Sequence, residues 1–455
     1  MTTTETPQPA TFDVTAAALL DRIVRRQASV GVIGLGYVGL PLVQAFAAEG
    51  FTVRGFDVDP EKVAKLAAGE SYIRHISSER IARLNASGRF AASEDFDGLA
   101  EVDAMLICVP TPLAAGQEPD MTYVIGTAEA IATRLRPGQL VILESTTYPG
   151  TTVEVIQPIL ERGGLRSGKD FYLAYSPERE DPGNPDFGTA GIPKVVGGDG
   201  HAALQLAKTL YDQVVIATVP VSDTQTAEAV KLTENIFRAI NIALVNELKQ
   251  VYEAMGIDVW EVIDAARTKP FGFMPFYPGP GLGGHCIPID PFYLAWRARA
   301  FDQETRLIGL AGEINTAMPG YVVGRLKDAL EARSGKDLKG ARVLLVGLAY
   351  KKNVDDLRES PALTLIELLE GEGAKVDYHD PYISEIMRTR EHPDLAGRRS
   401  VPWTVESLAG FDAALISTDH DAVDYGLLID NVPLVVDSRN IIARKGLESD
   451  RVIKA

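Results

Sequence analysis

The residues best suited to chemistry lie in a glycine-rich stretch, GPGLGGHCIPIDP, at positions 279–291. Cys286 is a candidate nucleophile, and Asp290 follows it by four residues, a spacing that would place both groups on one side of a helical turn. The stretch ends a loop at positions 270–291 that is rich in Gly, Pro and Phe. Loops of this length without regular structure are usually functional or disordered, and the aromatic residues favour order. A single cysteine is nevertheless more often structural than reactive, so Cys286 needs support from other residues.

Three further polar residues could give that support. Lys231 and Asn235 lie four residues apart in a long helical pattern, so an amine and an amide could converge on one substrate. Glu178 follows the apolar segment FYLAYSP at its carboxyl end. Each has a structural alternative: a solvated lysine, an amide that packs between helices, and a surface acid. Only their combination with Cys286 favours a catalytic role.

A second motif, GLGYVG, follows an apolar segment and opens an apolar helical pattern. In such a motif the first glycine allows a tight turn, the second lets a pyrophosphate approach the backbone, and the third lets the helix pack on the strand. The start of the helix then presents backbone N–H groups to the phosphates. The motif predicts a dinucleotide site, against the alternative of a glycine turn that binds nothing. Its residues are Gly34, Gly36, Tyr37, Val38 and Gly39.

An acid and two strand ends strengthen this prediction. Asp57 lies eighteen residues beyond the last glycine and ends the next apolar segment, where its carboxylate would accept hydrogen bonds from a ribose and repel a 2′-phosphate. NAD is therefore favoured over NADP. Two later segments end in VPTP and STT, so Pro110, Thr111 and Thr146 should border the cofactor. Glu144 points the same way but could equally cap a helix.

Composition excludes several classes of protein. The 455 residues include 46% hydrophobic and 24% charged residues, as in ordinary globular proteins, and the net charge of −17 argues against nucleic acid as a partner. The presence of only two cysteines, Cys108 and Cys286, argues against a disulfide framework and favours a cytoplasmic setting. Cys108 lies inside an apolar segment and is predicted to be buried and inert. We expect no membrane span, since no run of about eighteen apolar residues occurs, and no metal site.

The alternation of apolar strands with helical patterns predicts an α/β protein with two Rossmann-type, doubly wound parallel-sheet domains joined by a long central helix. A polar tail at 1–12, expected to be disordered, precedes a helical pattern at 14–27 that could dock on the first domain. The long helix is predicted at 224–255 and favours a homodimer or a higher even-numbered oligomer. The predicted divisions are 1–28 for the tail and first helix, 29–222 for NAD, 223–334 for a central helical region with the cysteine loop, and 335–455 for the second Rossmann-like domain.

Six motifs occur in order along the chain: the GxGxxG opening, SPERED, AVKLTEN, GGHCIPIDP, GLAYKKNVDDLRESP and VVDSRN. Together they resemble the UDP-glucose/GDP-mannose dehydrogenase family from about residue 29 onwards. The resemblance implies a nucleotide-sugar 6-dehydrogenase that uses two NAD molecules in a four-electron oxidation. Cys286 would attack the C6 aldehyde to give a thiohemiacetal, which is oxidised to a thioester and hydrolysed to the acid.

The same resemblance implies roles for the residues around this cysteine. Lys231 and Asn235 would stabilise the oxyanion, and Asp290 would assist proton transfer. Glu178 would activate water, and Thr146 would position a catalytic water. The group that takes the first alcohol proton is left open. Arg358 would reach the NAD of the active site, and the implied substrate contacts are Glu178, Arg179, Lys231, Asn235, Phe276, Tyr277, Gly279, Gly281, Lys351 and Arg439.

The residues around the cysteine also bear on the sugar. Members that act on UDP-glucose typically have Ser before the cysteine and Phe-Pro-Lys-Asp after it, whereas this chain has His285 before it and Ile289 in place of that lysine. SPEREDPGNP resembles the UDP-N-acetylglucosamine branch. The expected substrate is UDP-N-acetylglucosamine, with UDP-N-acetylmannosamine, UDP-N-acetylgalactosamine and UDP-glucose as alternatives. Two rivals remain: a two-electron β-hydroxyacid dehydrogenase, which needs no nucleophilic cysteine, and a non-catalytic NAD-binding regulator.

Overall fold

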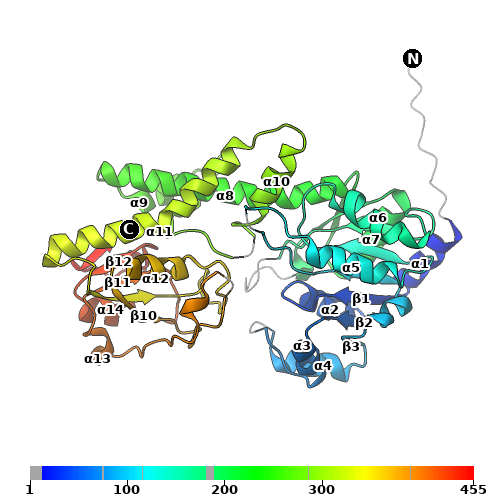
Figure 1. Cartoon of the computed structure of the whole chain (residues 1–455), viewed down its shortest axis with the longest axis horizontal. Helices are drawn as coiled ribbons and strands as arrows, with labels where there is room; N and C mark the ends of the chain where they lie inside the picture. The colour runs from blue at the N-terminus through cyan, green and yellow to red at the C-terminus, as the bar shows by residue number, and fades with distance from the viewer. Residues whose placement is uncertain (1–12, 74–75, 115, 181–188, 285, 390) are drawn as a thin grey trace, which may run out of the picture. The chain divides into compact units, whose positions relative to one another are not determined.

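The computed structural model describes residues 13–73, 76–114, 116–180, 189–284, 286–389 and 391–455 (Figure 1). The tail predicted at 1–12 lies outside the described residues. The chain forms two compact units, the first comprising residues 1–234 and 296–301 and the second comprising residues 235–295 and 302–455. Each unit is built on its own sheet, with helices against both faces. The predicted α/β class with two Rossmann-type sheets is confirmed.

The first unit holds an eight-stranded sheet in the order β3-β2-β1-β4-β5-β6-β7-β8. The order reverses direction between β1 and β4, which is the switch point where ligands bind in open α/β sheets. The bounds are β1 Ser29–Ile33, β2 Thr52–Phe56, β3 Phe90–Ser93, β4 Ala104–Ile107, β5 Leu140–Leu143, β6 Tyr172–Tyr175, β7 Lys194–Gly198 and β8 Thr218–Pro220.

One pairing in this sheet differs from the prediction of an all-parallel sheet. The pairing of β7 with β6 is antiparallel, whereas β8 pairs with β7 in parallel. An antiparallel neighbour can follow directly in the chain, while a parallel one needs a crossover, usually a helix. The motif SPERED follows β6 directly, on the segment that leads to β7.

Alternate residues along the strands face opposite layers of helices. Val32 and Leu106 pack with α1, α2 and α7 in one core, while Met105 and Ile107 pack with α5 and α6 in the other. The helices of this unit are α1 Val14–Val24, α2 Gly39–Ala48, α3 Pro60–Ala67, α4 Ser78–Ala86, α5 Thr122–Ala132, α6 Gln157–Leu160 and α7 His201–Tyr211, with shorter helical turns at Phe96–Glu101, Thr152–Ile156, Glu161–Gly163 and Thr189–Gly191.

Helix α1 docks on the first unit, as the sequence predicted for positions 14–27. Its N-cap, Asp13, accepts a hydrogen bond from the backbone N–H of Ala16 and another from the Tyr172 hydroxyl. Near its other end, Arg22 binds Asp103, which is 1% exposed and directly precedes β4. Asp103 also accepts hydrogen bonds from the backbone N–H of Ser29 and from Arg136, so one buried carboxylate joins the helix to the sheet.

Helix α8, Thr224–Ala254, matches the long helix predicted at 224–255 and continues from the first unit into the second. Further helices are α9 Val259–Ala266, α10 Asp290–Arg299 and α11 Arg306–Ser334. In the second unit, α8 and α11 are joined by two buried amides, because Asn246 donates to the side chain of Asn315, which in turn donates to the Ala239 carbonyl. Residues 267–284 and 286–289 contain no helix or strand, as predicted for this loop.

The second sheet has the order β10-β9-β11-β12-β13 and is parallel throughout. Alternate residues of β9 again face two cores, one with α11 and α12 and one with α13, α14 and α15. The strands are β9 Arg342–Val346, β10 Lys375–His379, β11 Ala413–Ile416, β12 Val435–Asp437 and β13 Val452–Lys454; the helices are α12 Pro361–Gly371, α13 Val405–Leu408, α14 Tyr425–Asn431 and α15 Ile441–Arg444, with a turn at Pro393–Leu395.

Asp103→Ala should destabilise the first unit by about 3 kcal/mol, because it leaves Arg22, Arg136 and a backbone N–H without their shared acceptor. Urea unfolding with hydrogen exchange of β4 would measure the loss. Glu129→Ala is the matched control, since it breaks an exposed pair with Arg162 and should cost less than about 1 kcal/mol. Equal losses in the two variants would contradict this account of Asp103.

Candidate active site

The turn after β1 has the geometry that a dinucleotide requires. Gly34 has a φ of +93°, and a Cβ there would lie 2.6 Å from the Cys108 carbonyl oxygen. A Cβ on Gly39 would lie 1.9 Å from the Gly34 carbonyl oxygen, so α2 packs directly on the turn. A Cβ on Gly36 would meet nothing within 4 Å. The first and third glycines are therefore required by the fold, while the second leaves backbone open to a phosphate, as the motif predicted.

The carboxylate of Asp57 lies beside this turn. It is 6% exposed and accepts hydrogen bonds from the backbone N–H groups of Leu35 and Asp59, at 2.9 and 3.0 Å. Lys62 lies 3.5 Å from the same carboxylate. These contacts hold the acid at the carboxyl end of β2, the position expected of a group that binds a ribose. At the head of α2, Val38 gives no side-chain cap, which suits a helix end whose N–H groups bind phosphate.

The ends of β4 and β5 also border this edge of the sheet. Ser145 donates to the carbonyl oxygen of Val109 at 2.7 Å and so joins the two strand ends. Thr146 is half-buried, while the hydroxyl of Thr147 is buried without a hydrogen-bond partner among the described residues. Such an orphaned hydroxyl is the kind of group that a bound ligand satisfies. Pro110 is exposed at the same edge.

Glu228 on α8 holds the segment that follows these threonines, and no sequence motif pointed to it. Its carboxylate accepts hydrogen bonds from the N–H of Gly150 and from the N–H and hydroxyl of Thr152, at 2.6, 2.8 and 2.6 Å. Burial raises the pKa of Glu228 to about 7, although the three donors lower it. The same helix carries Lys231 one turn later, so the positions of α8 and of the 145–152 segment are linked within the first unit.

Lys231 and Glu178 are in contact, but not through the carboxylate. The ammonium of Lys231 is 2.6 Å from the backbone carbonyl oxygen of Glu178, and this lysine is only 8% exposed, so it is not a solvated helix charge. The carboxylate of Glu178 accepts from the N–H groups of Arg179 and Glu180 and lies 3.4 Å from the buried Lys194. Arg179 itself pairs with Glu234.

In the second unit, the cysteine lies at the start of a helical turn. The N–H of Asp290 donates to the Cys286 carbonyl oxygen at 2.8 Å, and α10 begins at Asp290. The buried Asp290 carboxylate accepts a hydrogen bond from the Asn235 side chain at 2.6 Å. The structure thus brings together Cys286, Asp290 and Asn235, three of the predicted residues. Cys286 is half-buried, whereas Cys108 is buried and its thiol pKa is raised by burial, as expected of an inert core thiol.

The aromatic and glycine-rich loop before the cysteine is held by side chains of the second unit. Tyr277 donates to Asp264, and Phe276 packs edge-on against Phe237. The N–H of Gly279 donates to the buried Asn246 on α8. Asn246 and its partner on α11 were not predicted as site residues, because a buried amide in a helical pattern looks like any other polar residue.

Arg439 lies against this loop. Its guanidinium donates to the Ser417 carbonyl oxygen, and a Cβ on Gly279 would lie 2.6 Å from its Nη1. Burial lowers the pKa of Arg439, against the influence of Asp419 and Asp437. The absence of a side chain at Gly279 lets the guanidinium lie against the loop, and a guanidinium suits phosphate and sugar oxygens because its donors form a planar fork.

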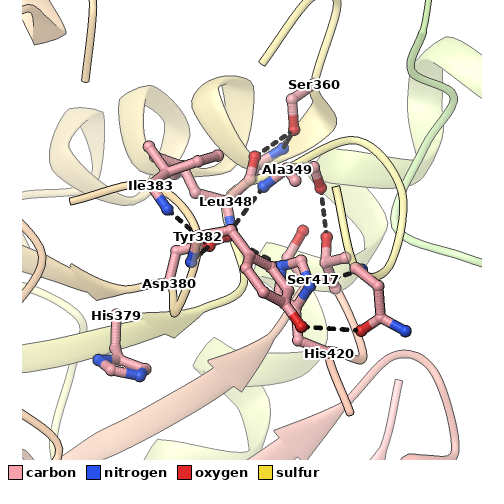
Figure 2. A network of polar contacts seen from close by, with 12 residues as sticks. Leu348, Ala349, Ser360, His379, Asp380, Tyr382, Ile383, Ser417 and His420 are labelled. Carbon is pink, nitrogen blue, oxygen red and sulfur yellow. Dashed lines mark hydrogen bonds and ion pairs between the residues drawn. The ribbon is translucent and has the colours of Figure 1, made fainter. Parts of the chain in front are cut away.

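The basic loop after β9 is fixed by a buried acid–histidine pair, shown in Figure 2. Asp380 accepts hydrogen bonds from the N–H groups of Leu348 and Ala349, at 2.6 and 3.2 Å, and from Nε2 of His420 at 2.9 Å. The other ring nitrogen of His420 accepts from the Asn353 N–H at 2.9 Å, so the ring carries its proton on Nε2. Burial alone would raise the pKa of Asp380, but the hydrogen bonds and His420 hold it below its usual value.

This loop also contacts the glycines that precede the cysteine. A Cβ on Gly283 or Gly284 would lie 2.6 or 2.7 Å from the side chain of Tyr350. The N–H of Gly284 donates to the Arg358 carbonyl oxygen at 3.1 Å. The Arg358 guanidinium forms a two-pronged contact with Asp356 within the loop. Lys351 is half-buried in the loop, and Gly281 lies near Pro361, so the predicted substrate residues of this unit gather around one pair of loops.

Comparison with known proteins gives the same assignment along most of the chain. Residues 28–215 match the NAD-binding domain, residues 225–317 the central domain and residues 344–444 the UDP-binding domain of one family. The chain belongs to the UDP-glucose/GDP-mannose dehydrogenase family. It is therefore an NAD-dependent dehydrogenase of UDP-sugars, and the open backbone at Gly36, the placement of Asp57 and the orphaned Thr147 hydroxyl fit NAD.

Individual relatives agree on the class of substrate and differ in the sugar. The chain is 38% identical to the UDP-N-acetyl-D-glucosamine 6-dehydrogenase of Pseudomonas aeruginosa, over 78% of this chain and 83% of that one. It is 35% identical to the UDP-N-acetyl-D-mannosamine dehydrogenase of Pyrococcus horikoshii, over 91% and 96%. A solved structure described as the latter enzyme from the same organism superimposes with a TM-score of 0.84 over 94% of this chain and 98% of that one, at 34% identity.

Some residues singled out in the sequence lie outside the described residues, and for Glu144 the structure decides between the two alternatives left open. His285 and the DPGNP part of the SPERED segment lie outside the described residues. Glu144 does not cap a helix. It is 1% exposed, and its carboxylate lies 2.6 Å from the ammonium of Lys194. No helix among the described residues is long and apolar enough to cross a membrane.

His420→Phe should loosen the basic loop, because it keeps the ring volume but removes both hydrogen bonds of the imidazole. Hydrogen exchange at residues 347–353 should quicken by about tenfold or more, and KM for the UDP-sugar should rise more than kcat falls. His392→Phe is the matched control, since His392 belongs to the same unit but pairs with Glu367 and not with Asp380. Unchanged exchange in His420→Phe would show that the pair does not hold the loop.

Proposed function

We propose that this enzyme oxidises the C6 hydroxyl of UDP-N-acetylglucosamine to the carboxylate, giving UDP-N-acetylglucosaminuronic acid. The observation that carries the sugar is the 38% identity to the Pseudomonas aeruginosa enzyme named for this substrate. Ile289 supports it, since the chain lacks the lysine typical of UDP-glucose enzymes at this position. Residues 29–222 would bind NAD, residues 335–455 the UDP-sugar, and residues 223–334 would carry the cysteine loop.

In this proposal, NAD supplies the hydride acceptor, and two molecules are needed for four electrons. The Cys286 thiolate adds to the C6 aldehyde carbon, and after the second oxidation the sugar is held as a thioester on its sulfur. Lys231 and the Asn235 amide donate to the oxygen of the reacting carbon. Preorganised donors of this kind contribute most where charge develops. The hydrogen bond from Asn235 to Asp290 supports this proposal, because it would orient the amide and leave its second N–H for the oxyanion.

Hydrolysis of the thioester requires a base. Water adds to the thioester carbonyl carbon, its proton passes to the Glu178 carboxylate, and the carbon–sulfur bond then breaks to release the Cys286 thiolate. Thr146 would hold the water. Glu178 suits the role because its carboxylate is held by two backbone N–H groups yet is 14% exposed.

The contacts with the UDP-sugar are proposed for the two loops of the second unit. Arg439 would bind phosphate or sugar oxygens beside Gly279, while Tyr277 and Gly281 would line the loop that covers the nucleotide. Lys351 would add a cation from the basic loop. Arg358 is proposed to contact the NAD. To do so, its guanidinium would have to give up its ion pair with Asp356.

A second candidate substrate is UDP-N-acetylmannosamine. The relative named for this sugar covers more of the chain, 91%, and its structure superimposes closely. The two sugars differ at one stereocentre, so the shape of the pocket around the N-acetyl group decides between them.

We also propose that the enzyme is a homodimer formed through α8. Phe237, Leu244 and Val251 are spaced by seven residues, which places them on one face of the helix, and each is 47–49% exposed. Met255 continues the stripe at 64% exposure. A second copy of the same helix would cover such an apolar face.

Four UDP-sugars should separate the candidates: UDP-N-acetylglucosamine, UDP-N-acetylmannosamine, UDP-N-acetylgalactosamine and UDP-glucose. We expect kcat/KM to be highest for the first and at least about tenfold lower for UDP-glucose. Initial rates of NADH formation would measure this. A higher value for UDP-N-acetylmannosamine would replace the first candidate by the second.

NADH counted per sugar should approach two, because both oxidations occur before release. Cys286→Ala should lower complete turnover by about three orders of magnitude or more, since the nucleophile is gone. Cys108→Ala, at the other cysteine of the chain, should retain most of the activity. If about one NADH forms per UDP-sugar, or if Cys286→Ala keeps full turnover, the thioester route is ruled out.

Leu244→Glu should place two charges in the proposed interface and convert the dimer to single chains at micromolar concentration, as sedimentation velocity would show. Leu368→Glu is the control, because Leu368 is similarly exposed, at 39%, on α12. A wild-type protein that sediments as a single chain would rule the dimer out.

A further inference from the structure

A buried lysine in the first unit lies between two carboxylates. Lys194 opens β7, is 4% exposed, and its ammonium lies 2.6 Å from Glu144 and 3.4 Å from Glu178. It is also 3.3 Å from the Pro177 carbonyl oxygen. A lysine buried this deeply is costly unless its charge is matched. The position therefore demands at least one ionised carboxylate beside it.

The two carboxylates differ in their surroundings. Glu144, which directly follows β5, is 1% exposed and accepts a hydrogen bond from the buried Tyr211 hydroxyl. Burial raises the pKa of Glu144, against the opposing attraction of Lys194. Burial also raises the pKa of Glu178, but Lys194, the backbone N–H groups and Lys231 outweigh it and the net direction is down. The ammonium is therefore shared by one acid that is sealed in the core and one that reaches solvent.

Every element packed around Glu178 contributes a charged or titratable group. β7 contributes Lys194, and α8 contributes Lys231, with Glu234 held by Arg179. Cys108 follows β4, Glu144 follows β5, and Tyr211 ends α7. Glu180 lies two residues after Glu178 in the chain. Cys108 and Tyr211 are uncharged in this burial, since it raises the pKa of both. Among these described groups, the two lysines face Glu144 and Glu178, Arg179 pairs with Glu234, and Glu180 is a further carboxylate next to Glu178 in the chain.

We propose that Lys194 is a positioning residue that keeps Glu178 ionised for thioester hydrolysis, and that Glu144 moderates it by competing for the same ammonium. This inference rests on the role of Glu178 in the proposed function. In this proposal Lys194 acts on the reaction only through the Glu178 carboxylate. The closer contact to Glu144 leaves Glu178 basic enough to accept a proton from water.

Two substitutions should move the same quantity in opposite directions. Lys194→Met removes the ammonium, so the acid limb of the pH profile for hydrolysis should move up by about one pH unit or more. Glu144→Gln removes the competitor and should move that limb down. Lys194→Arg keeps the charge and should restore a profile near that of the wild type. Loss of structure alone would lower the rate without shifting the limb.

The measurement is a single turnover of the full chain with NAD and UDP-N-acetylglucosamine, or with whichever of the four UDP-sugars is oxidised fastest. Intact-mass spectrometry follows the adduct on Cys286 from about pH 5 to pH 9, and its decay gives the hydrolysis rate. In Lys194→Met the adduct should persist to a higher pH than in the wild type. Lys208→Met, which removes a partly exposed lysine of α7 in the same unit, is the matched control and should leave the limb in place.

Two outcomes test the inference apart from the proposed function. If the wild type forms two NADH per sugar but the limb stays fixed in both Lys194→Met and Glu144→Gln, the role of Lys194 is overturned while the proposed function stands. If one NADH forms and no adduct appears, the proposed function fails, and this inference fails with it. Should Lys194→Met not fold, the charge-balanced Lys194→Met/Glu144→Gln variant replaces it, and the limb must still move up.

Discussion

Burial of charge at the carboxyl ends of parallel strands is the constraint on which both units depend. A carboxylate or ammonium removed from water is costly unless neighbours supply opposite charge or several hydrogen bonds. In the first unit, Lys194 and Glu144 meet this requirement together, and Asp57 meets it through two backbone donors. In the second, Asp380 meets it with backbone donors and His420. Each solution also fixes a loop at the edge where ligands bind.

The first strand of each sheet's Rossmann-type unit ends in a glycine turn beside a buried acid, but the two turns differ in detail. After β1 the chain turns through glycines that keep the backbone open, and the nearby acid faces the turn. After β9, Gly347 has a φ of +83° and packs on Thr418, but a buried acid takes up the next backbone N–H groups. Those donors are no longer available to a phosphate. The two turns differ in how many backbone N–H groups the acid takes, since Asp57 takes that of Leu35 whereas Asp380 takes those of both Leu348 and Ala349.

Much of this architecture follows from local pattern. The alternation of apolar segments predicted most strands, and helical periodicity predicted α8 almost to the residue. The edge strands β3 and β13 were not predicted, because FAAS and VIK are short segments that are only partly apolar and do not lie within a longer apolar run. The antiparallel β7 was missed for another reason: direction depends on the path of the connection, and PKVVGG reads the same either way.

The candidate site divides in the same manner. Residue type and spacing are enough to predict Cys286, Asp290 and the glycine motif. Other residues matter only through partners that are distant in the sequence, namely Lys194, Glu228, Asn246 and His420. A lysine at the head of an apolar strand was a signal that could have been used, since such a position is costly for a charge. Nothing local marks Asn246 or Glu228.

The contact of Tyr350 with Gly283 and Gly284 has a consequence for engineering. Because these glycines have no room for a side chain on that side, the cysteine loop and the basic loop form one interlocked surface. A chimaera that took only one of these loops from a relative would place it against a loop to which its side chains are not fitted. Exchange of sugar specificity between relatives therefore calls for moving residues 279–290 and 347–361 as a single cassette, with the tyrosine and its glycines travelling together.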